Sequence, residues 1–221
     1  MNEIMENVFE QDFGKKKVLL TLNQVPGINV YGERLNKINE KEFREWDPTS
    51  SKIAAAIKKG LKNINLKKNN VILYLGASSG TTVSHLSDIL NEGFIFGVEI
   101  SPSMCRDLVF LAEQRKNIAP ILADANHPEI YGKRITKVDW LYQDVSQKNQ
   151  VEIFLKNIKL FLKPKGYALL ALKAKNIDIT KKPREVFDKV DKELQKELKV
   201  LEKIELEPYQ KDHCLFVCQK I

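Results

Sequence analysis

The hydrophobic positions of the chain follow two alternating patterns from about residue 70 onward. Short uninterrupted apolar runs alternate with longer stretches in which apolar residues recur every three or four positions. The first pattern predicts buried strands and the second predicts amphipathic helices. We expect strands over 71–75, 94–99, 118–123, 138–143, 167–173, 201–206 and 213–219, and helices over 81–91, 103–116, 148–162 and 183–198.

This alternation is typical of a mostly parallel sheet with helices on both faces. Only residues 207–212 separate the last two expected strands, which is too short for a crossover helix. The final strand is therefore expected to run antiparallel to its neighbour. The predicted fold class is α/β, with a Rossmann-like sheet of seven strands.

The N-terminal region has a different pattern, with short strand-like runs and turns. Candidate strands lie at 18–22 and 29–31, Asp47-Pro48 interrupts the chain, and a helix is expected over 51–61 with Ser50 or Ser51 as its N-cap. We expect a small β-rich subdomain over residues 1–50 and the main domain over 51–221. The subdomain has too few apolar residues to fold well alone, so it should pack on the main domain or on a partner.

The first expected strand of the main domain leads into a small-residue turn, Gly76-Ala77-Ser78-Ser79-Gly80, and the second ends on Glu99. Small residues let the backbone approach a ligand, and a carboxylate about 20 residues later accepts hydrogen bonds from ribose hydroxyls. A glycine turn alone is also ordinary connection chemistry, but with Glu99 it predicts a nucleoside-cofactor site. The turn lacks the G-x-G-x-x-G fingerprint and the P-loop lysine, which favours S-adenosylmethionine over NAD.

Polar residues stand where several expected strands end or begin at one edge of the sheet. They are Glu99, Asp124, Asp144, Lys173 and His213. Each has a simpler interpretation: the aspartates as helix N-caps, Lys173 as an exposed strand end, and His213 as a loop residue. Because ligands bind beyond the carboxyl ends of parallel strands, the topology gathers all five at one edge and indicates a site.

Composition and charge narrow the function classes. The chain of 221 residues has a formal net charge of +7, which favours a role linked to RNA or DNA. No apolar run approaches the roughly 18 residues of a membrane span, and the acidic N-terminus lacks a signal-peptide pattern, so a cytoplasmic location without membrane association is expected. Cys105, Cys214 and Cys218 form no ligand cluster, and we expect buried thiols and no metal.

An ordered set of motifs along essentially the whole chain resembles fibrillarin, specifically the archaeal fibrillarin-like RNA 2′-O-methyltransferases. The matching segments are Glu45-Trp46-Asp47-Pro48 with Ser51-Lys52, residues 74–85, Gly97-Val98-Glu99, residues 122–125, Asp144-Val145-Ser146-Gln147, residues 172–175, Glu207-Pro208-Tyr209 and Asp212-His213.

The resemblance implies a class I methyltransferase fold, S-adenosyl-L-methionine as methyl donor, and transfer to ribose 2′-hydroxyls of rRNA and tRNA. It implies a catalytic set that falls here on Lys52, Asp144, Lys173 and His213. It implies cofactor contacts at Gly76, Thr81, Thr82, Glu99, Ile100, Asp124, Ala125, Asp144, Val145, Ser146 and Gln147. As a mechanism, we expect Lys173 to act as base or oxyanion stabiliser, oriented by Asp144, with Lys52 as a second cation and His213 positioning the ribose or phosphate.

The family also implies partners: box C/D guide RNA, a Nop5-type scaffold protein and an L7Ae-type RNA-binding protein. The chain departs from the family pattern at Ser50, Lys148 and Lys175, where Arg, Pro and Arg are usual, and it lacks a Gly/Arg-rich tail. The alternatives are a nicotinamide-dependent oxidoreductase, a non-catalytic subunit of an RNA–protein particle, and a protein glutamine methyltransferase.

Overall fold

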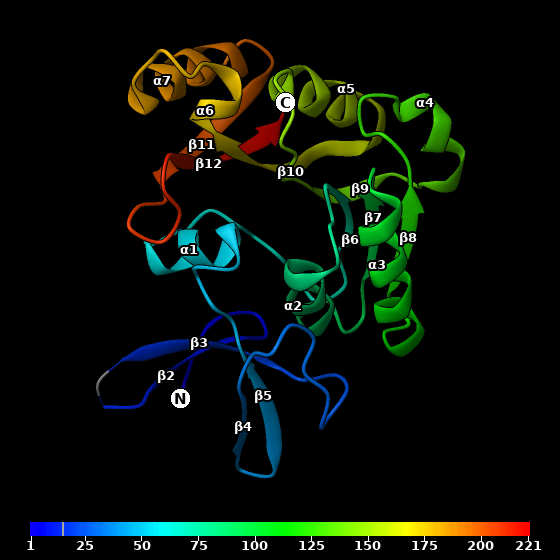
Figure 1. Cartoon of the computed structure of the whole chain (residues 1–221), viewed down its shortest axis with the longest axis vertical. Helices are drawn as coiled ribbons and strands as arrows, with labels where there is room; N and C mark the ends of the chain where they lie inside the picture. The colour runs from blue at the N-terminus through cyan, green and yellow to red at the C-terminus, as the bar shows by residue number, and fades with distance from the viewer. Residues whose placement is uncertain (15) are drawn as a thin grey trace.

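A seven-stranded sheet forms the centre of the larger part of the molecule (Figure 1). In the computed structural model, which describes residues 1–14 and 16–221, the strand order is β11-β12-β10-β9-β6-β7-β8. The strands are β6 (Val71–Leu75), β7 (Phe94–Glu99), β8 (Ile118–Leu122), β9 (Val138–Gln143), β10 (Leu162–Lys173), β11 (Leu198–Glu205) and β12 (His213–Lys220). Strand β12 runs antiparallel to both β10 and β11, while β6–β10 pair in parallel, so the expected sheet and its antiparallel last strand are confirmed.

Helices cover both faces of this sheet and give it two hydrophobic cores. The helices are α1 (Lys52–Lys58), α2 (Thr81–Ile89), α3 (Pro102–Gln114), α4 (Pro128–Tyr131), α5 (Gln150–Phe161), α6 (Ala174–Ile177) and α7 (Pro183–Leu194), with a 3₁₀ turn η1 (Gly132–Arg134). Ile53, Val83 and Leu108 from α1–α3 belong to one core, and Phe154 and Phe187 from α5 and α7 belong to the other. Apolar burial on both faces explains why the central strands read as uninterrupted apolar runs.

The predicted helices exist, but several are shorter than expected. Helix α1 ends at Lys58 instead of residue 61, and α7 ends at Leu194 instead of residue 198, where β11 begins. Helices α4 and α6 were not predicted, because four residues give no repeat of apolar positions from which to recognise a helix. The three cysteines are buried, as expected, and carry free thiols.

A separate antiparallel sheet is formed by the N-terminal residues, in the order β1-β2-β3-β5-β4 (Figure 1). Its strands are β1 (Asn2–Met5), β2 (Val8–Asp12), β3 (Lys17–Leu22), β4 (Leu35–Ile38) and β5 (Lys41–Glu45). The expected strand at 18–22 is therefore confirmed, but the one at 29–31 is wrong. There the backbone N–H groups of Val30 and Tyr31 donate to the carboxylate of Glu33, so they are not available for a sheet.

A buried polar network joins the N-terminal sheet to helix α2. Arg44 of β5 donates to Glu33 at 2.6 Å and to Asp88 of α2 at 2.8 Å, and Arg115 donates to the other Asp88 oxygen. All four side chains are almost completely buried. Two guanidinium groups thus neutralise two carboxylates, which satisfies the requirement that buried charges be paired.

His85 of α2 completes this contact. The hydroxyl of Thr21 donates to Asp88, so the imidazole Nδ1–H of His85 donates to Thr21 and Nε2 accepts from the hydroxyl of Tyr31. Trp46 stacks on the imidazole at a centroid distance of 5.1 Å. Burial and the two nearby guanidinium groups hold the pKa of His85 well below its usual value, in agreement with this neutral tautomer.

Within residues 1–14 and 16–221, no helix combines the length and the apolar composition needed to cross a membrane. The same residues contain no group of three or more His, Cys, Asp or Glu side chains arranged to hold a metal ion.

Candidate functional site

The turn after β6 adopts a conformation that requires glycine. Gly76 has φ of +81°, and a Cβ built there would lie 2.4 Å from the backbone oxygen of Asp144. Gly80, with φ of +101°, precedes the first residue of α2. The glycine turn therefore brings two segments of backbone together at the carboxyl end of the sheet, where ligands bind in this fold class.

Glu99 is fixed by this same turn. Its two carboxylate oxygens accept hydrogen bonds from the backbone N–H groups of Ser78, at 2.7 Å, and Ser101, at 2.8 Å. The side chain is largely buried and its orientation is set before any ligand arrives. Because each carboxylate oxygen has two acceptor positions, Glu99 retains capacity for ribose hydroxyls.

A cavity of about 320 Å³ opens beside Glu99. It is lined by Gly76, Glu99, Ile100, Ala125, Asp144, Val145, Ser146 and Gln147, all expected cofactor residues, and also by Ser78, Val98 and Ala123. Its size lies in the roughly 300–1,000 Å³ range of small-molecule sites. The mixture of carboxylates and apolar groups fits a nucleoside with a charged tail.

The other three expected cofactor residues, Asp124, Thr81 and Thr82, do not line this cavity. Asp124 accepts hydrogen bonds on Oδ1 from Asn126 N–H, at 2.8 Å, and Gln147 Nε2, at 3.3 Å, so it braces the segment that forms one wall. Thr81 lines a different cavity, beside α3, and the hydroxyl of Thr82 donates to Ser51 at 3.1 Å. The two threonines thus begin α2 and connect it to α1.

Lys52 and Asp144 form an ion pair at the edge of the cofactor cavity. Lys52 Nζ lies 2.7 Å from Asp144 Oδ2, and both side chains are about four-fifths buried. This corrects our expectation that Asp144 orients Lys173, since the carboxylate is engaged by Lys52. Lys52 is the first residue of α1, and the hydrogen bond from Thr82 to Ser51 holds this end of the helix near the carboxyl end of β9.

Lys173 and His213 lie next to each other, as the last residue of β10 and the first of β12, which pair directly. Lys173 is exposed and has no carboxylate partner among the residues that the structure describes. His213 carries the electrostatic influence of Lys52, Asp144 and Lys173 together, so the four residues form one group. The topology predicted that Asp144, Lys173 and His213 lie at one edge of the sheet, the resemblance added Lys52, and in the structure the four lie together.

His213 is held as a neutral imidazole with a defined tautomer. Its Nδ1 lies 2.6 Å from the carbonyl oxygen of Lys211, and because a carbonyl only accepts, Nδ1 must carry the proton. Burial, with the nearby ammonium groups of Lys52 and Lys173, lowers the pKa of His213 from its usual value. Nε2 is therefore an acceptor, which suits a ribose hydroxyl and not a phosphate oxygen.

A family model confirms what these motifs indicated. The model described as Fibrillarin matches residues 1–221. The chain belongs to the fibrillarin family.

Known fibrillarins resemble this chain closely along their whole length. The fibrillarin-like rRNA/tRNA 2′-O-methyltransferase of Thermococcus gammatolerans is 50% identical over 95% of this chain and 92% of its own length. The crystal structure of Aeropyrum pernix fibrillarin with natively bound S-adenosyl-L-methionine has a TM-score of 0.89 and 42% identity, covering 96% of this chain and 94% of that one. The fibrillarin of a fibrillarin/Nop5p complex has a TM-score of 0.92 and 41% identity, and both chains are covered completely.

Sequence reasoning missed the contacts that hold this fibrillarin site in place from outside it. It named Ser51 and Thr82 for other roles and missed the hydrogen bond between them that connects α1 to α2, and it gave no role to Tyr74 and Tyr142, which lie buried on β6 and β9 with ring centroids 4.6 Å apart. The tyrosines were read only as strand residues, because an apolar run does not distinguish a packed phenol from another core side chain. The departures Ser50 and Lys175 have local partners here, Asp47 and Asp212.

Proposed function

We propose that this fibrillarin is an S-adenosylmethionine-dependent RNA methyltransferase that modifies ribose 2′-hydroxyls of rRNA and tRNA within a box C/D guide complex. The observation that carries the proposal is the position of Asp144. It lines the cofactor cavity and at the same time pairs with Lys52, which belongs to the group with Lys173 and His213. One side chain thus joins a nucleoside-sized cavity to a cluster suited to proton transfer.

The residues around the 320 Å³ cavity fit S-adenosylmethionine, which supplies an electrophilic methyl group when bound. Glu99, fixed by two backbone N–H groups, is placed to accept from ribose hydroxyls. Ile100, more than half exposed, offers an apolar surface for a base, and Gly76 leaves room for the close approach of the ligand. The Aeropyrum pernix relative was crystallised with this cofactor, which supports the assignment.

The cluster can orient a ribose and accept its proton. Lys52, paired with Asp144, places its positive charge where it can stabilise negative charge near the reacting oxygen. Lys173, with no such carboxylate partner in the described part of the chain, is the better placed lysine to take the proton, which it does as the neutral amine after its ammonium group has released a proton to solvent. His213 Nε2 accepts a hydrogen bond from a ribose hydroxyl and thereby turns the sugar toward the cavity.

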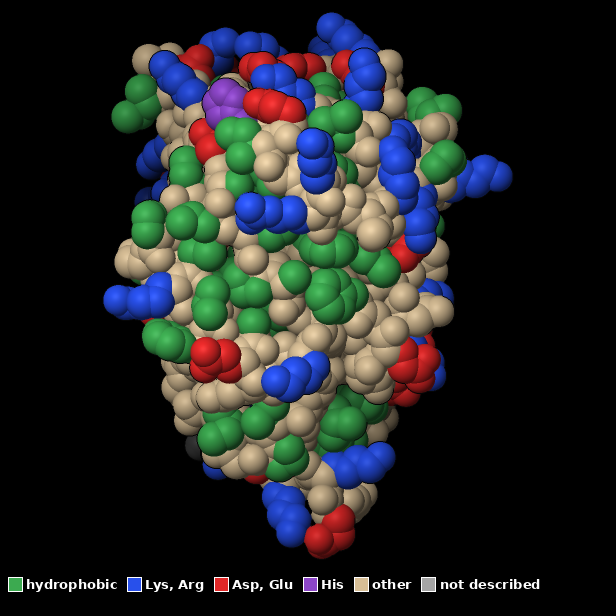
Figure 2. Space-filling model, turned by 90° about the vertical axis from the view of Figure 1, so that its right-hand side faces the viewer, with side chains coloured by type: hydrophobic (Ala, Val, Ile, Leu, Met, Phe, Trp, Pro, Cys, Tyr) green, Lys and Arg blue, Asp and Glu red, His purple; other side chains and the backbone are tan. Residues whose placement is uncertain are grey.

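Target choice is proposed to come from partners. The chain carries +7 net charge, but Figure 2 shows that on one face its basic side chains are dispersed among apolar and uncharged ones. Dispersed charge gives affinity for phosphates without reading sequence. Box C/D guide RNA would supply the specificity by base pairing, in a complex with a Nop5-type scaffold and an L7Ae-type protein. The related fibrillarin/Nop5p complex supports the scaffold partner.

The test is methyl transfer from labelled S-adenosylmethionine to a guided RNA by the assembled complex, with Lys173→Ala and the control Lys199→Ala. Lys199 is an exposed lysine of β11. Loss of a positioned base lowers kcat by roughly 10²–10⁴-fold, and cofactor affinity measured by calorimetry should not change. Lys199→Ala should behave as the wild type.

Two results would contradict the proposal. Full activity of Lys173→Ala would remove this lysine from the mechanism. No transfer to RNA by the wild-type assembly, despite cofactor binding, would favour a structural subunit or a protein acceptor.

A further inference from the structure

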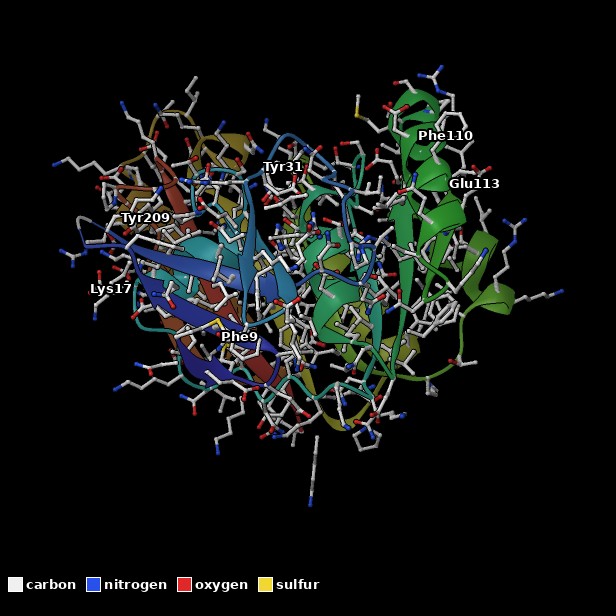
Figure 3. All side chains as sticks on the ribbon, turned by 90° about the horizontal axis from the view of Figure 1, so that it is seen from below. Phe9, Lys17, Tyr31, Phe110, Glu113 and Tyr209 are labelled. Atoms are coloured by element: carbon white, nitrogen blue, oxygen red, sulfur yellow. The ribbon has the colours of Figure 1, made fainter. Side chains whose placement is uncertain are left out.

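A second and larger cavity is lined by residues that flank Lys52 in the chain, Ser50 and Lys58. Its volume is about 530 Å³. The walls come from the start of β3, the loop Tyr31–Arg34, the segment Glu45–Ser50, Lys58 of α1, which is paired with Glu10, and Tyr209 of the β11–β12 loop. Figure 3 shows Tyr31, Tyr209 and Lys17, which come from three different segments of the chain.

Two of these walls continue directly into the proposed active site. Ser50 is two residues before Lys52, and Tyr209 is four residues before His213. The walls are connected to each other, since the side-chain amide of Gln210 donates to the backbone oxygens of Pro48 and Thr49. A molecule in this cavity would therefore be an immediate neighbour of the ribose that Lys52 and His213 are proposed to hold.

The cavity offers free positive charge. The side chains of Arg34 and Lys16 are exposed and form no ion pair with any residue that the structure describes. Of the three carboxylates in the lining, Glu33 is paired with Arg44, Asp47 accepts hydrogen bonds from the hydroxyl and N–H of Thr49, and Glu45 accepts one from the side-chain amide of Asn36. Phosphate is the anion that such a pair of long basic side chains binds most readily.

The cavity also offers an aromatic surface, and an unpaired donor is buried in its wall. Tyr209 is partly buried against the core and lines the cavity with its remaining surface. The indole N–H of Trp46, another lining residue, is buried and has no hydrogen-bond partner in the described structure. Aromatic faces combined with basic side chains are the elements with which proteins hold single nucleotides of an RNA strand.

We propose that this cavity binds the nucleotide of the target RNA strand adjacent to the methylated one. Arg34 and Lys16 contact its phosphate, and Tyr209 contacts its base. The assignment rests on the proposed function, because it identifies a neighbour of the ribose in that same site. Stacking and phosphate contacts tolerate any base, as a subunit that works with many guides requires.

The first test measures kcat/KM for target RNA in the assembled complex with Arg34→Glu and Tyr209→Leu. Tyr209→Leu retains apolar packing and removes the aromatic face. The control is Arg134→Glu, an exposed arginine of η1 with the same change of charge. Each test variant should lower kcat/KM by about tenfold, in line with the loss of one stacking or phosphate contact. The control should match the wild type, and all variants should bind S-adenosylmethionine and the scaffold protein normally.

The second test places 4-thiouridine at each nucleotide flanking the methylation site and maps the photo-crosslinks on this chain. Crosslinks to Tyr209 or to Tyr31–Arg34 from a directly adjacent nucleotide are expected. Three results would overturn the subsite: crosslinks only elsewhere, wild-type kcat/KM in both variants, or a fall in kcat/KM that is explained by lost scaffold binding. As long as the wild type still transfers the methyl group, these results leave the proposed function intact. A wild-type complex without any transfer would instead contradict the proposed function itself.

Discussion

At the scale of single residues, the site depends on backbone geometry as much as on reactive side chains. The sequence identified Gly76, Glu99, Asp144 and His213 as site residues, because a glycine turn, carboxylates and a histidine next to strand termini indicate a ligand site. It could not assign hydrogen-bond partners, since these depend on distances between segments far apart in the chain. The pairing of Asp144 with Lys52 instead of Lys173 is the clearest case.

Gly76→Ala tests the close approach of the glycine turn to Asp144. The new Cβ would meet the Asp144 carbonyl oxygen at 2.4 Å, in addition to strain from a positive φ. We expect Gly76→Ala to lower the free energy of unfolding by more than the roughly 1–3 kcal/mol of backbone strain alone and to weaken S-adenosylmethionine binding. Gly60→Ala is the matched control, because Gly60 has φ of +93° with open space around it. Equal costs in urea unfolding would contradict the clash.

His213 gives the reaction a predicted acidic limit. Because the pKa of His213 is lowered, its Nε2 remains a hydrogen-bond acceptor at neutral pH. Protonation removes this acceptor only as the pH falls below the usual histidine range. We expect kcat/KM to have an acidic limb with a midpoint below pH 6.5, and His213→Gln, which cannot titrate, to lack that limb. The same shift makes protonation unfavourable to the fold, so the free energy of unfolding also decreases toward low pH.

A rate profile that contradicts this assignment would have its acidic midpoint above 6.5, or would retain the limb in His213→Gln. NMR titration of the imidazole gives an independent reading. The chain has three histidines, and the buried His85 should stay neutral over the range in which His213 titrates, since its pKa is lowered further.

At the scale of elements, periodicity identified the strands of the larger sheet and most of its helices. It was wrong at 29–31, where Glu33 takes the backbone N–H groups that a strand would use, and it did not find β1, β2, β4 or β5. These strands are short and carry polar residues on exposed faces, so their apolar alternation is weak. Their stability comes from packing and from the buried network on α2, which no local pattern reveals.

Arg44→Met tests that network. It leaves Glu33 and one oxygen of Asp88 buried without their guanidinium partner. We expect the free energy of unfolding to fall by about 3–5 kcal/mol, the usual result of breaking a buried ion pair from one side. Urea unfolding measures it. In Arg106→Met, which removes an arginine from an exposed pair with Asp107, the change should stay within about 0.5 kcal/mol. Similar values for both variants would show that the buried network does not stabilise the contact between the N-terminal sheet and α2.

At the scale of the whole molecule, two cavities are lined by segments that also carry the residues of the cluster. The cofactor cavity lies at the carboxyl ends of β6, β7 and β9, and the larger cavity lies between the N-terminal sheet and the β11–β12 loop. Asp144 lines the first cavity, and two lining residues of the second, Ser50 and Tyr209, stand two and four residues before Lys52 and His213 in the chain. The N-terminal residues therefore contribute one wall of the proposed RNA site, a role that composition alone gave no reason to assign.

The most direct test of the central claim compares two target RNAs in the assembled complex with labelled S-adenosylmethionine. One carries a ribose 2′-hydroxyl at the nucleotide selected by the guide, and the other carries a 2′-deoxyribose only there. The account predicts stoichiometric methylation of the first RNA at that 2′-oxygen and none of the second. Equal labelling of both RNAs, or label found only on protein, would contradict it.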